Sequence, residues 1–540
     1  MRTHRERRRV APGGPMTENV LVGVDAGLTN VTVAAYDPDG TELAAASRST
    51  PRSEPDGAAG EAGGTGGTAN GGVDASEGAA ADREEQDHDR LWAVVAETVG
   101  AVVGSDDVPT DAVAGVGVAG HGHGLYGLDA AGEPVCGIKS TDSRALDALD
   151  EHCAEGARER AVDRLGWEPF GADPLSLLVW LRANEPATYD RLDTLLFCKD
   201  VLTHRLTGER VTDPTEGSVF YGPNAAYDRE AFAALGIEAA FKALPPVIPS
   251  TESCGAMTVE AAADTGLPEG TPVAAGLQDV GACTFGAGLV EPGDGLAILG
   301  TWGQSVAVLD SPDDGAGGLL RRYLDGWYRY RGIRAGAACV DWFVDRCGGD
   351  WRREACERGV DPYEVYEEAV AGVDPGADGL VFHPFLQGST DDPSSAGGFY
   401  GLRLSHTSAH MLRAIYEGVA ITQTGALDTL TPAVGTIRLT GGGAQSDAWS
   451  KLFADVADAP VTVPDARETG ALGAALCGGT AAGVYPDAAT AVDRAVGTAQ
   501  SYEPDSAAVA AYRRVSEAFD QAVDGMEVPW ETLKTFRRED

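Results

Sequence analysis

Short apolar runs near the start of the chain predict a strand meander. Residues 20–25 (VLVGVD) and 32–37 (TVAAYD) have the length and composition of buried strands, and the DPDG sequence at 37–40 predicts a turn into a third strand. A helical apolar period follows at 91–103, and then an unbroken apolar strand at 113–120 (VAGVGVAG). This order indicates that an α/β domain begins near residue 20.

The alternation of strands and helices continues through the rest of the chain. A strand that ends in a chemically active turn occurs twice, near Asp25 and near Gly300. We therefore expect a duplicated α/β fold with a hinge near 285–295. The further elements predicted by the pattern are mostly helix from 143 to about 206, a strand and small-residue helix at 271–288, a strand at 296–301, an apolar-striped helix at 411–427, a strand, glycine turn and helix start at 436–446, and a small-residue helix at 468–479.

The length of the chain, 540 residues, exceeds what one hydrophobic core supports, so we expect two large lobes, at 16–288 and 289–540. Within the first lobe, residues 53–82 are rich in Gly, Ala, Ser and Asp and predict a disordered surface insertion. Residues 1–15 are Arg-rich and precede Met16. We expect a disordered segment there or a misassigned start, with translation beginning at Met16; a basic nucleic-acid-binding arm is the alternative.

The charge balance is strongly acidic, with 83 Asp and Glu against 41 Lys and Arg. Such self-repulsion destabilises a compact state at low salt and is screened at multimolar salt, so we expect a halophilic protein rather than an ordinary acidic one. The charge makes nucleic acids and anionic membranes unfavourable partners. No apolar run is long enough to span a membrane, no secretory signal is present, and the nine cysteines lack metal-site spacing, which together predict a cytoplasmic protein with reduced thiols.

Two turns carry candidate phosphate chemistry. Asp25 ends a strand, Gly27 allows a tight turn and Thr29 supplies a hydroxyl. Backbone N–H groups in such a turn can bind phosphate oxygens, and the carboxylate can hold water-coordinated Mg²⁺. Gly300 and Thr301 follow a similar strand in the second half. Each turn alone is also compatible with an ordinary hairpin.

Three further segments have candidate chemistry. The run Gly441-Gly442-Gly443-Ala444 after a strand leaves room for a flat ring, and the next helix N-terminus favours phosphate; a plain strand–helix turn is the alternative. Gln278-Asp279 places a carboxylate at a strand end, where it could orient an attacking hydroxyl or only cap the helix. His121 and His123 lie in a glycine-flanked loop, where imidazoles can bond sugar hydroxyls; a metal site is disfavoured because a third ligand is missing.

Several motifs resemble those of the FGGY carbohydrate kinases. The most specific is GGFYGL at 397–402, followed after seven residues by His410-Met411 and by residues 414–417, which closes the pattern. The segment PLSLLVWL at 174–181, Glu85-Gln86-Asp87 before Trp92, and GALGAA at 470–475 resemble other family segments. The resemblance runs from about residue 20 to 500. It implies the duplicated ribonuclease-H/actin-like ATPase fold, with two lobes around a central cleft.

Within the family the likeness is strongest to the ketopentose kinases of the L-xylulose kinase type, through AGHGHGLYGLD at 119–129 and STDSRA at 140–145. The resemblance implies ATP and Mg²⁺ as cofactors, a small sugar such as xylulose as substrate, and room for a homodimer. It implies that Asp279 is the catalytic base, that Asp25 and Asp279 hold Mg²⁺ through water, and that the remaining contacts come from two sets. These are His121, His123, Asp142, Arg144 and Gln278 for sugar, and Gly27, Thr29, Gly300, Thr301 and Gly441–Ala444 for phosphates and adenine.

Three positions depart from the family pattern. Leu28 stands where most members have Thr or Gly, Thr32 where they have Lys or Arg, and Trp302 where a small residue is commoner. Because the other motifs occur in the family order, the leading hypothesis is an ATP-dependent sugar kinase acting on a ketopentose. Its alternatives are a glycerol, erythritol or other polyol kinase, a non-catalytic sugar-binding sensor, and a sugar-independent ATPase of the same fold.

Overall fold

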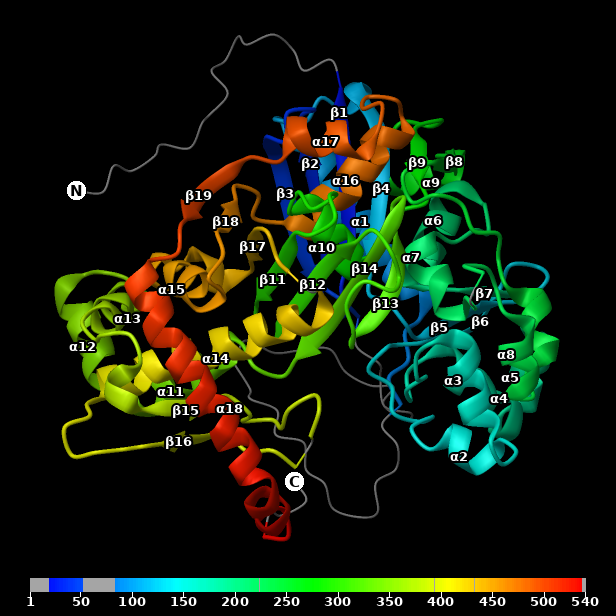
Figure 1. Cartoon of the computed structure of the whole chain (residues 1–540). Helices are drawn as coiled ribbons and strands as arrows, with labels where there is room; N and C mark the ends of the chain where they lie inside the picture. The colour runs from blue at the N-terminus through cyan, green and yellow to red at the C-terminus, as the bar shows by residue number, and fades with distance from the viewer. Residues whose placement is uncertain (1–18, 52–82, 223, 393, 432, 537–540) are drawn as a thin grey trace, which may run out of the picture.

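The computed structural model describes residues 19–51 and 83–536, apart from Pro223, Pro393 and Pro432. The elements of these residues are arranged around two seven-stranded mixed sheets, one in each half of the chain (Figure 1). The segments expected to be a basic start (1–15) and a disordered insertion (53–82) lie outside the described residues.

The first sheet has the strand order β3-β2-β1-β4-β9-β8, and β10 pairs with β4. The predicted meander is confirmed, because β1 is antiparallel to β2 and β2 is antiparallel to β3. β4 and β10 run parallel to β1 and to β4 respectively, so the carboxyl ends of the three strands share one edge. The bounds are β1 Val20–Ala26, β2 Asn30–Tyr36, β3 Glu42–Ser49, β4 Val113–Gly120, β8 Ser253–Ala256, β9 Pro272–Ala274 and β10 Leu277–Gln278.

The second sheet has the order β13-β14-β12-β11-β17-β18-β19. Its central strands β11 and β17 are parallel, which again brings two strand ends to one edge. The strands expected at 296–301 and 436–440 are confirmed as β11 and β17, and β12 to β14 are the further strands of the set that the segment at 296–301 was expected to open, although the pattern did not predict their bounds. The bounds are β11 Gly295–Leu299, β12 Gly303–Leu309, β13 Leu319–Tyr323, β14 Gly326–Ile333, β17 Ile437–Thr440, β18 Val461–Pro464 and β19 Thr498–Tyr502.

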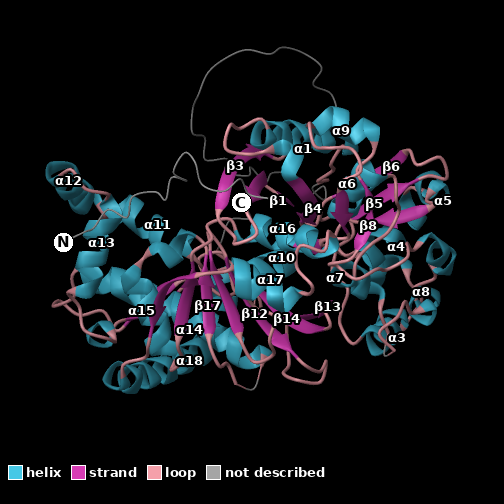
Figure 2. Cartoon of the chain, turned by 90° about the horizontal axis from the view of Figure 1, so that it is seen from above, coloured by secondary structure: helices cyan, strands magenta, loops and turns pink. Residues whose placement is uncertain are grey.

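Helices and sheets stack in layers, as Figure 2 shows from above. One apolar core joins the first sheet to α1, α6 and α9, and a second joins the other face of that sheet through α10 and α16 to the second sheet. A third core lies between the second sheet and α11, α14 and α15. The bounds are α1 His88–Val103, α6 Cys198–Thr207, α9 Val259–Thr265, α10 Asp279–Gly286, α11 Ala337–Cys347, α14 Ser408–Leu430, α15 Asp447–Ala457 and α16 Thr469–Ala481.

The two small-residue helices, α10 and α16, cross in the middle of these layers. A Cβ added at Gly473 would lie 2.0 Å from the carbonyl oxygen of Ala282 in α10, and one added at Gly117 in β4 would lie 1.8 Å from that of Ala474. Backbones that approach so closely leave no space for side chains. The small residues of the helices predicted at 271–288 and 468–479 are thus what allows the two halves to pack so closely.

A separate apolar core covers residues 125–244, with the three-stranded sheet β6-β5-β7 at its side. The helical prediction for 143–206 is correct except for β7 (Thr194–Leu196). The other bounds are β5 Leu125–Leu128, β6 Pro134–Ile138, α2 Ala148–His152, α3 Ala157–Leu165, α4 Pro174–Asn184, α5 Pro186–Arg191, α7 Pro214–Gly217, α8 Arg229–Ala234, α12 Gly349–Arg358, α13 Pro362–Ala371, β15 Val381–His383, β16 Gly398–Tyr400, α17 Ala488–Ala495 and α18 Ser506–Lys534. In the part of the chain that the structure describes, no helix is long and apolar enough to cross a bilayer.

Candidate functional site

Two carboxylates lie at the shared edge of β1, β4 and β10. Asp25 is opposite Ala119 in the β1–β4 register, Gln278 is opposite Gly120 in the β4–β10 register, and Asp279 begins α10. The Oδ1 atom of Asp279 accepts a hydrogen bond of 2.7 Å from the backbone N–H of Val280. The strand order thus unites residues that lie about 250 positions apart in the sequence.

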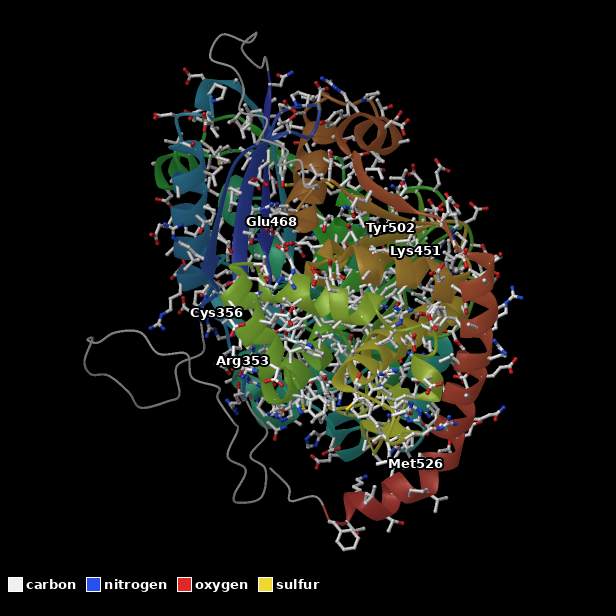
Figure 3. The ribbon with its side chains drawn as sticks, turned by 90° about the vertical axis from the view of Figure 1, so that its left-hand side faces the viewer. Arg353, Cys356, Lys451, Glu468, Tyr502 and Met526 are labelled. Atoms are coloured by element: carbon white, nitrogen blue, oxygen red, sulfur yellow. The ribbon has the colours of Figure 1, made fainter. Side chains whose placement is uncertain are left out.

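The electrostatics of this edge favour a bound cation. Burial raises the pKa of Asp25 to about 7, with further contributions from the charges of Asp279 and Glu468. Burial also raises the pKa of Asp279 to about 6, opposed by hydrogen bonds from the backbone N–H groups of Val280 and Gly122. Figure 3 shows Glu468 on one face of the molecule, near the boundary of the two halves. The charges of Asp279 and Glu468 thus add to burial in raising the pKa of Asp25, and a cation bound here would offset both effects.

The residues present fit a magnesium ion held partly by water and phosphate. Oδ1 of Asp25 is buried and, within the described residues, has no hydrogen-bond partner. Carboxylate oxygens are the ligands Mg²⁺ prefers, and it commonly retains waters and bridges to substrate phosphates. Among the described residues no group of three or more His, Cys, Asp or Glu could hold a metal by itself, so phosphate and water would complete the coordination.

The first phosphate turn is closed by its own backbone. The N–H of Gly27 donates to the carbonyl of Asn30 at 2.9 Å, and the hydroxyl of Thr50 donates to the carbonyl of Gly27 at 2.8 Å. Thr29 is exposed, so its hydroxyl is accessible. Thr32, which departs from the family pattern, pairs its hydroxyl with Ser47 on β3 at 3.1 Å.

The second phosphate turn and the glycine run meet at the edge of the second sheet. A Cβ at Gly441 would lie 2.7 Å from the carbonyl oxygen of Leu299 and 3.1 Å from the backbone nitrogen of Gly300, and its φ of 88° also requires glycine. Thr301 and Gly442 are exposed, Gly443 is half-buried, and Ala444 is buried. Gly300, Thr301 and the run Gly441–Ala444 are therefore neighbours, and the exposed backbone of the run faces solvent beside α15.

The two loop histidines have different environments. His121 is buried, with Nε2 at 3.0 Å from the hydroxyl of Tyr126 and Nδ1 at 3.4 Å from that of Ser140. Both ring nitrogens therefore have protein partners, and a direct contact of His121 with sugar stays a prediction. His123 has a φ of 60° and places Nε2 at 3.0 Å from the hydroxyl of Tyr330 on β14. It links the loop after β4 to the second sheet.

Gln278 joins the same interlobe network. Its side-chain amide donates to the hydroxyl of Tyr330 at 3.3 Å and accepts from that of Tyr328 at 2.7 Å, while its backbone N–H donates to Thr215 at 2.8 Å. The two tyrosines were missed by the sequence reasoning. The signal was there, since Tyr328 and Tyr330 alternate on β14 and so share one face of the sheet.

Asp142 and Arg144 bind each other. Nε and Nη2 of Arg144 lie 2.9 and 2.8 Å from the two carboxylate oxygens of Asp142, and Nη2 also donates to Glu85 at 2.8 Å. The backbone N–H of Glu84 donates to Asp142 at 2.7 Å. This cluster fixes the segment at 84–86 against the loop at 139–144; contact of Asp142 and Arg144 with sugar stays a prediction.

One cavity in the described residues lies away from these groups. It has a volume of about 490 Å³ and is lined from α14, α18 and the segment 388–395, with Arg331, Phe385 and Trp530 among its walls. None of the predicted site residues lines it. The residues gathered around Asp279 are therefore the better candidate site for chemistry.

Comparison with known proteins identifies the family. Residues 74–286 match the N-terminal domain of the FGGY family of carbohydrate kinases, and residues 295–482 match its C-terminal domain. The chain is 32% identical over 408 residues to the L-xylulose/3-keto-L-gulonate kinase of Escherichia coli K12, which covers 74% of this chain and 80% of that relative. It is 27% identical over 430 residues to the gluconokinase of Bacillus licheniformis, covering 77% and 83% respectively.

A solved structure agrees with these matches. The xylulose kinase from Rhodospirillum rubrum superposes with a TM-score of 0.80 at 26% identity, over 95% of this chain and all of that one. The fold is the actin-like ATPase fold of the FGGY sugar kinases, as the sequence motifs predicted. The family matches cover more than half of the residues, and the chain therefore belongs to the FGGY family of carbohydrate kinases.

Proposed function

We propose that the protein transfers the γ-phosphoryl group of ATP to a hydroxyl of a small sugar, and that Asp279 is the base. The observation that carries this proposal is the position of Asp279 at the start of α10, beside Asp25 and the loop containing His123. In phosphoryl transfer the protein mainly positions groups and neutralises charge, while one carboxylate orients the attacking hydroxyl.

The pKa of Asp279 suits that role. At about 6 it leaves most of the carboxylate ionised at neutral pH, yet makes it a better proton acceptor than an ordinary aspartate. The carboxylate takes the hydroxyl proton as the new bond between the sugar oxygen and the γ-phosphorus forms and the bond from that phosphorus to the bridging oxygen of ADP breaks, so that ADP leaves. The backbone bonds from Val280 and Gly122 keep the acceptor oxygens in place meanwhile.

The remaining predicted residues would hold the nucleotide. We assign the phosphates to the turns at Gly27–Thr29 and Gly300–Thr301, and adenine to the exposed backbone of Gly441–Ala444. Mg²⁺, when bound, would neutralise phosphate charge, with Asp25 and Asp279 holding it through water. The unpartnered oxygen of Asp25 supports this assignment.

A ketopentose such as xylulose is the substrate class that the relatives favour, because several of them are named as xylulose or L-xylulose kinases. Other relatives are named as gluconokinases, and one also as a 3-keto-L-gulonate kinase, so sugar acids belong to the same candidate set. Polyols such as glycerol or erythritol remain the alternative drawn from the sequence.

The test is a coupled ADP-release assay with Mg-ATP in multimolar KCl. It compares ketopentoses, sugar acids, glycerol, erythritol and a blank without sugar. Asp279→Asn should lower the sugar-dependent rate by roughly 10²–10⁴-fold, the contribution of a general base. Asp279 is the first residue of α10 and not its N-cap, which is Gln278, and Asn keeps an oxygen that can accept from the N–H of Val280, so the fold should survive. Asp361→Asn is the matched control, because Asp361 is also at the start of a helix, where it caps α13.

Three outcomes separate the alternatives. Loss of sugar-dependent ADP release in Asp279→Asn only, with Asp361→Asn unaffected, supports the kinase and the base. Equal ADP release with and without sugar indicates an ATPase. Sugar binding without turnover in the wild type indicates a non-catalytic sensor.

Several broader expectations stay proposals. We assign the lobe boundary to the segment between α10 and β11, at residues 288 and 289. We also retain a salt-rich cytoplasm as the setting of the protein and a homodimer as its assembly, without nucleic-acid or membrane partners. The assay uses multimolar salt because of the proposed salt-rich setting. Light scattering would test the homodimer.

A further inference from the structure

An arginine that no sequence motif singled out lies beside the candidate sugar site. Arg321 is on β13, directly opposite Tyr328 of β14, so the two side chains share the face of the second sheet that is turned toward the first lobe. Arg321 is fully buried, with an exposed fraction of 0%. Lysine and arginine are almost never so buried without a partner.

Half of the guanidinium of Arg321 lacks such a partner. Nη1 donates to the carbonyl of Leu320 at 2.9 Å. Within the described residues, the Nε and Nη2 atoms of Arg321 have no hydrogen-bond acceptor. These two nitrogens form one edge of the planar group, with parallel N–H bonds at the spacing of two carboxylate oxygens.

The surroundings of Arg321 contain a further donor and two buried carboxylates, Asp173 and Glu216. Its guanidinium lies over the ring of Trp167, 4.7 Å from the centroid. The indole Nε1 of Trp167 is also buried and, in the described part of the chain, without a partner. Oδ1 of Asp173 accepts from the N–H of Leu175 at 2.9 Å, and Oδ2 lies 3.5 Å from Nδ1 of His123. Within the described residues neither Asp173 nor Glu216 forms an ion pair with the guanidinium of Arg321.

The free edge belongs to the neighbourhood of the sugar-site residues. Tyr328, the cross-strand neighbour of Arg321, donates to Gln278, the residue before Asp279. The charge of Arg321 also contributes to lowering the pKa of His123, after the larger effect of burial. Arg321 and Asp279 thus flank one network: a hydroxyl at Asp279 and a second group near Arg321 could belong to one small molecule.

We infer that Arg321 binds the carboxylate of a sugar acid, so that the substrate is an aldonate or keto-aldonate rather than a neutral ketose. A carboxylate is planar and accepts only, which matches a fork of unpartnered N–H donors; a sugar hydroxyl would use one donor and leave the other buried and unpaired. This inference rests on the proposed kinase function and names the substrate class of the same site.

The next residue of β13 provides a matched control. Arg322 points to the opposite face, lies over Trp327 at 4.8 Å from the ring centroid, and donates from Nη2 to the carbonyl of Asp325 at 3.5 Å. It is half-buried. The two arginines therefore share strand, chemistry and sequence neighbourhood, and differ in the face they occupy.

The experiment measures kcat/KM for pairs of compounds that carry either a terminal carboxylate or a terminal hydroxymethyl group: D-gluconate and L-gulonate, each against D-glucitol, and D-xylonate against xylitol. Ketopentoses are included as neutral substrates. For at least one pair the wild type should favour the acid by roughly 10²–10³-fold, because a buried charged donor strongly disfavours a ligand that leaves it unpaired. Arg321→Met should remove most of that preference, Arg321→Lys should restore part of it, and Arg322→Met should keep it.

The outcomes separate this inference from the proposed function. Sugar-dependent ADP release with neutral sugars as good as or better than every acid, or an equal loss on acids and neutral sugars in Arg321→Met, overturns the carboxylate site and leaves the kinase standing. Absence of sugar-dependent ADP release with all compounds refutes the kinase itself. Should Arg321→Met not fold, as judged by thermal melting, calorimetric binding of the acid and its polyol to the Asp279→Asn protein decides instead, and equal affinities refute the inference.

Discussion

Replacing Gly470 by alanine should damage catalysis while leaving the fold intact. Gly470 is the second residue of α16, and a Cβ built there would lie 2.1 Å from Oδ2 of Asp25. Side-chain carbons do not approach other atoms closer than 3.0 Å, so the carboxylate must move by about 1 Å. A misplacement of that size at a reacting centre costs on the order of 10²-fold in rate, which is the loss expected in kcat.

The thermal stability of Gly470→Ala should rise slightly or stay unchanged, although its kcat falls. Alanine is favoured over glycine inside a helix by roughly 0.5–1 kcal/mol, and the partly exposed carboxylate of Asp25 can yield. Gly425→Ala is the control, because Gly425 lies within α14 and an added Cβ meets nothing within 4 Å. It should share the gain in thermal stability without the loss in rate.

The assay is initial-rate ADP release with saturating Mg-ATP and sugar, alongside thermal melting of both variants. A kcat of Gly470→Ala within about threefold of wild type would show that moving the carboxylate of Asp25 does not slow catalysis, and would refute this prediction. A fall in Tm together with the fall in rate would show instead that the packing of α16, rather than the position of Asp25, was disturbed.

Three further outcomes follow from the structure. Gly473→Ala should lower the free energy of unfolding by about 1–3 kcal/mol in denaturant titration, because its Cβ would lie 2.0 Å from the carbonyl of Ala282; an unchanged midpoint would contradict the close packing. Burial lowers the pKa of His383 to about 4, so the unfolded chain binds a proton there first and stability falls as pH drops below about 6.5. Between pH 7 and pH 5, the unfolding free energy of His383→Phe should therefore fall less than that of the wild type, by on the order of 1–2 kcal/mol, and its Tm should fall less as well. Equal losses in the two proteins would contradict this. Finally, with a net charge of −42, Tm should rise steeply between 0.1 and 2 M KCl, and a flat dependence would argue against a salt-adapted protein.

The most specific sequence motif turns out to be structural. Glu417, which ends the signature, is buried in α14, where its carboxylate accepts from Arg413 at 2.8 Å and from the N–H of Gly376 at 2.9 Å. The segment at 398–400 forms β16 beside β15. In the structure the motif residues serve packing and hydrogen bonding, while the candidate site residues around Asp279 lie elsewhere.

Local pattern determined much of this protein. Apolar periodicity located the β1–β3 meander, β4, α14 and α16, because each of these elements buries one face or both against a core, and burial constrains every residue along it. Asp25, Asp279 and the glycine run could also be found from sequence, since each lies at or directly after the carboxyl end of a strand, where parallel strands bring their loops to one edge.

Tertiary structure alone decided how those ends are combined. Tyr328, Tyr330 and Arg321 reach the site from strands about 40–50 residues beyond Asp279. Alternation on β14 puts the two tyrosines on one face of the sheet, but it does not show that this face meets the other lobe. The pairing of Asp142 with Arg144 and of His121 with Tyr126 was equally unpredictable. The sequence pattern specifies which groups are polar and which are buried. A hydrogen bond between the lobes also depends on distances of a few ångströms, and these distances are fixed by the packing of α10 against α16.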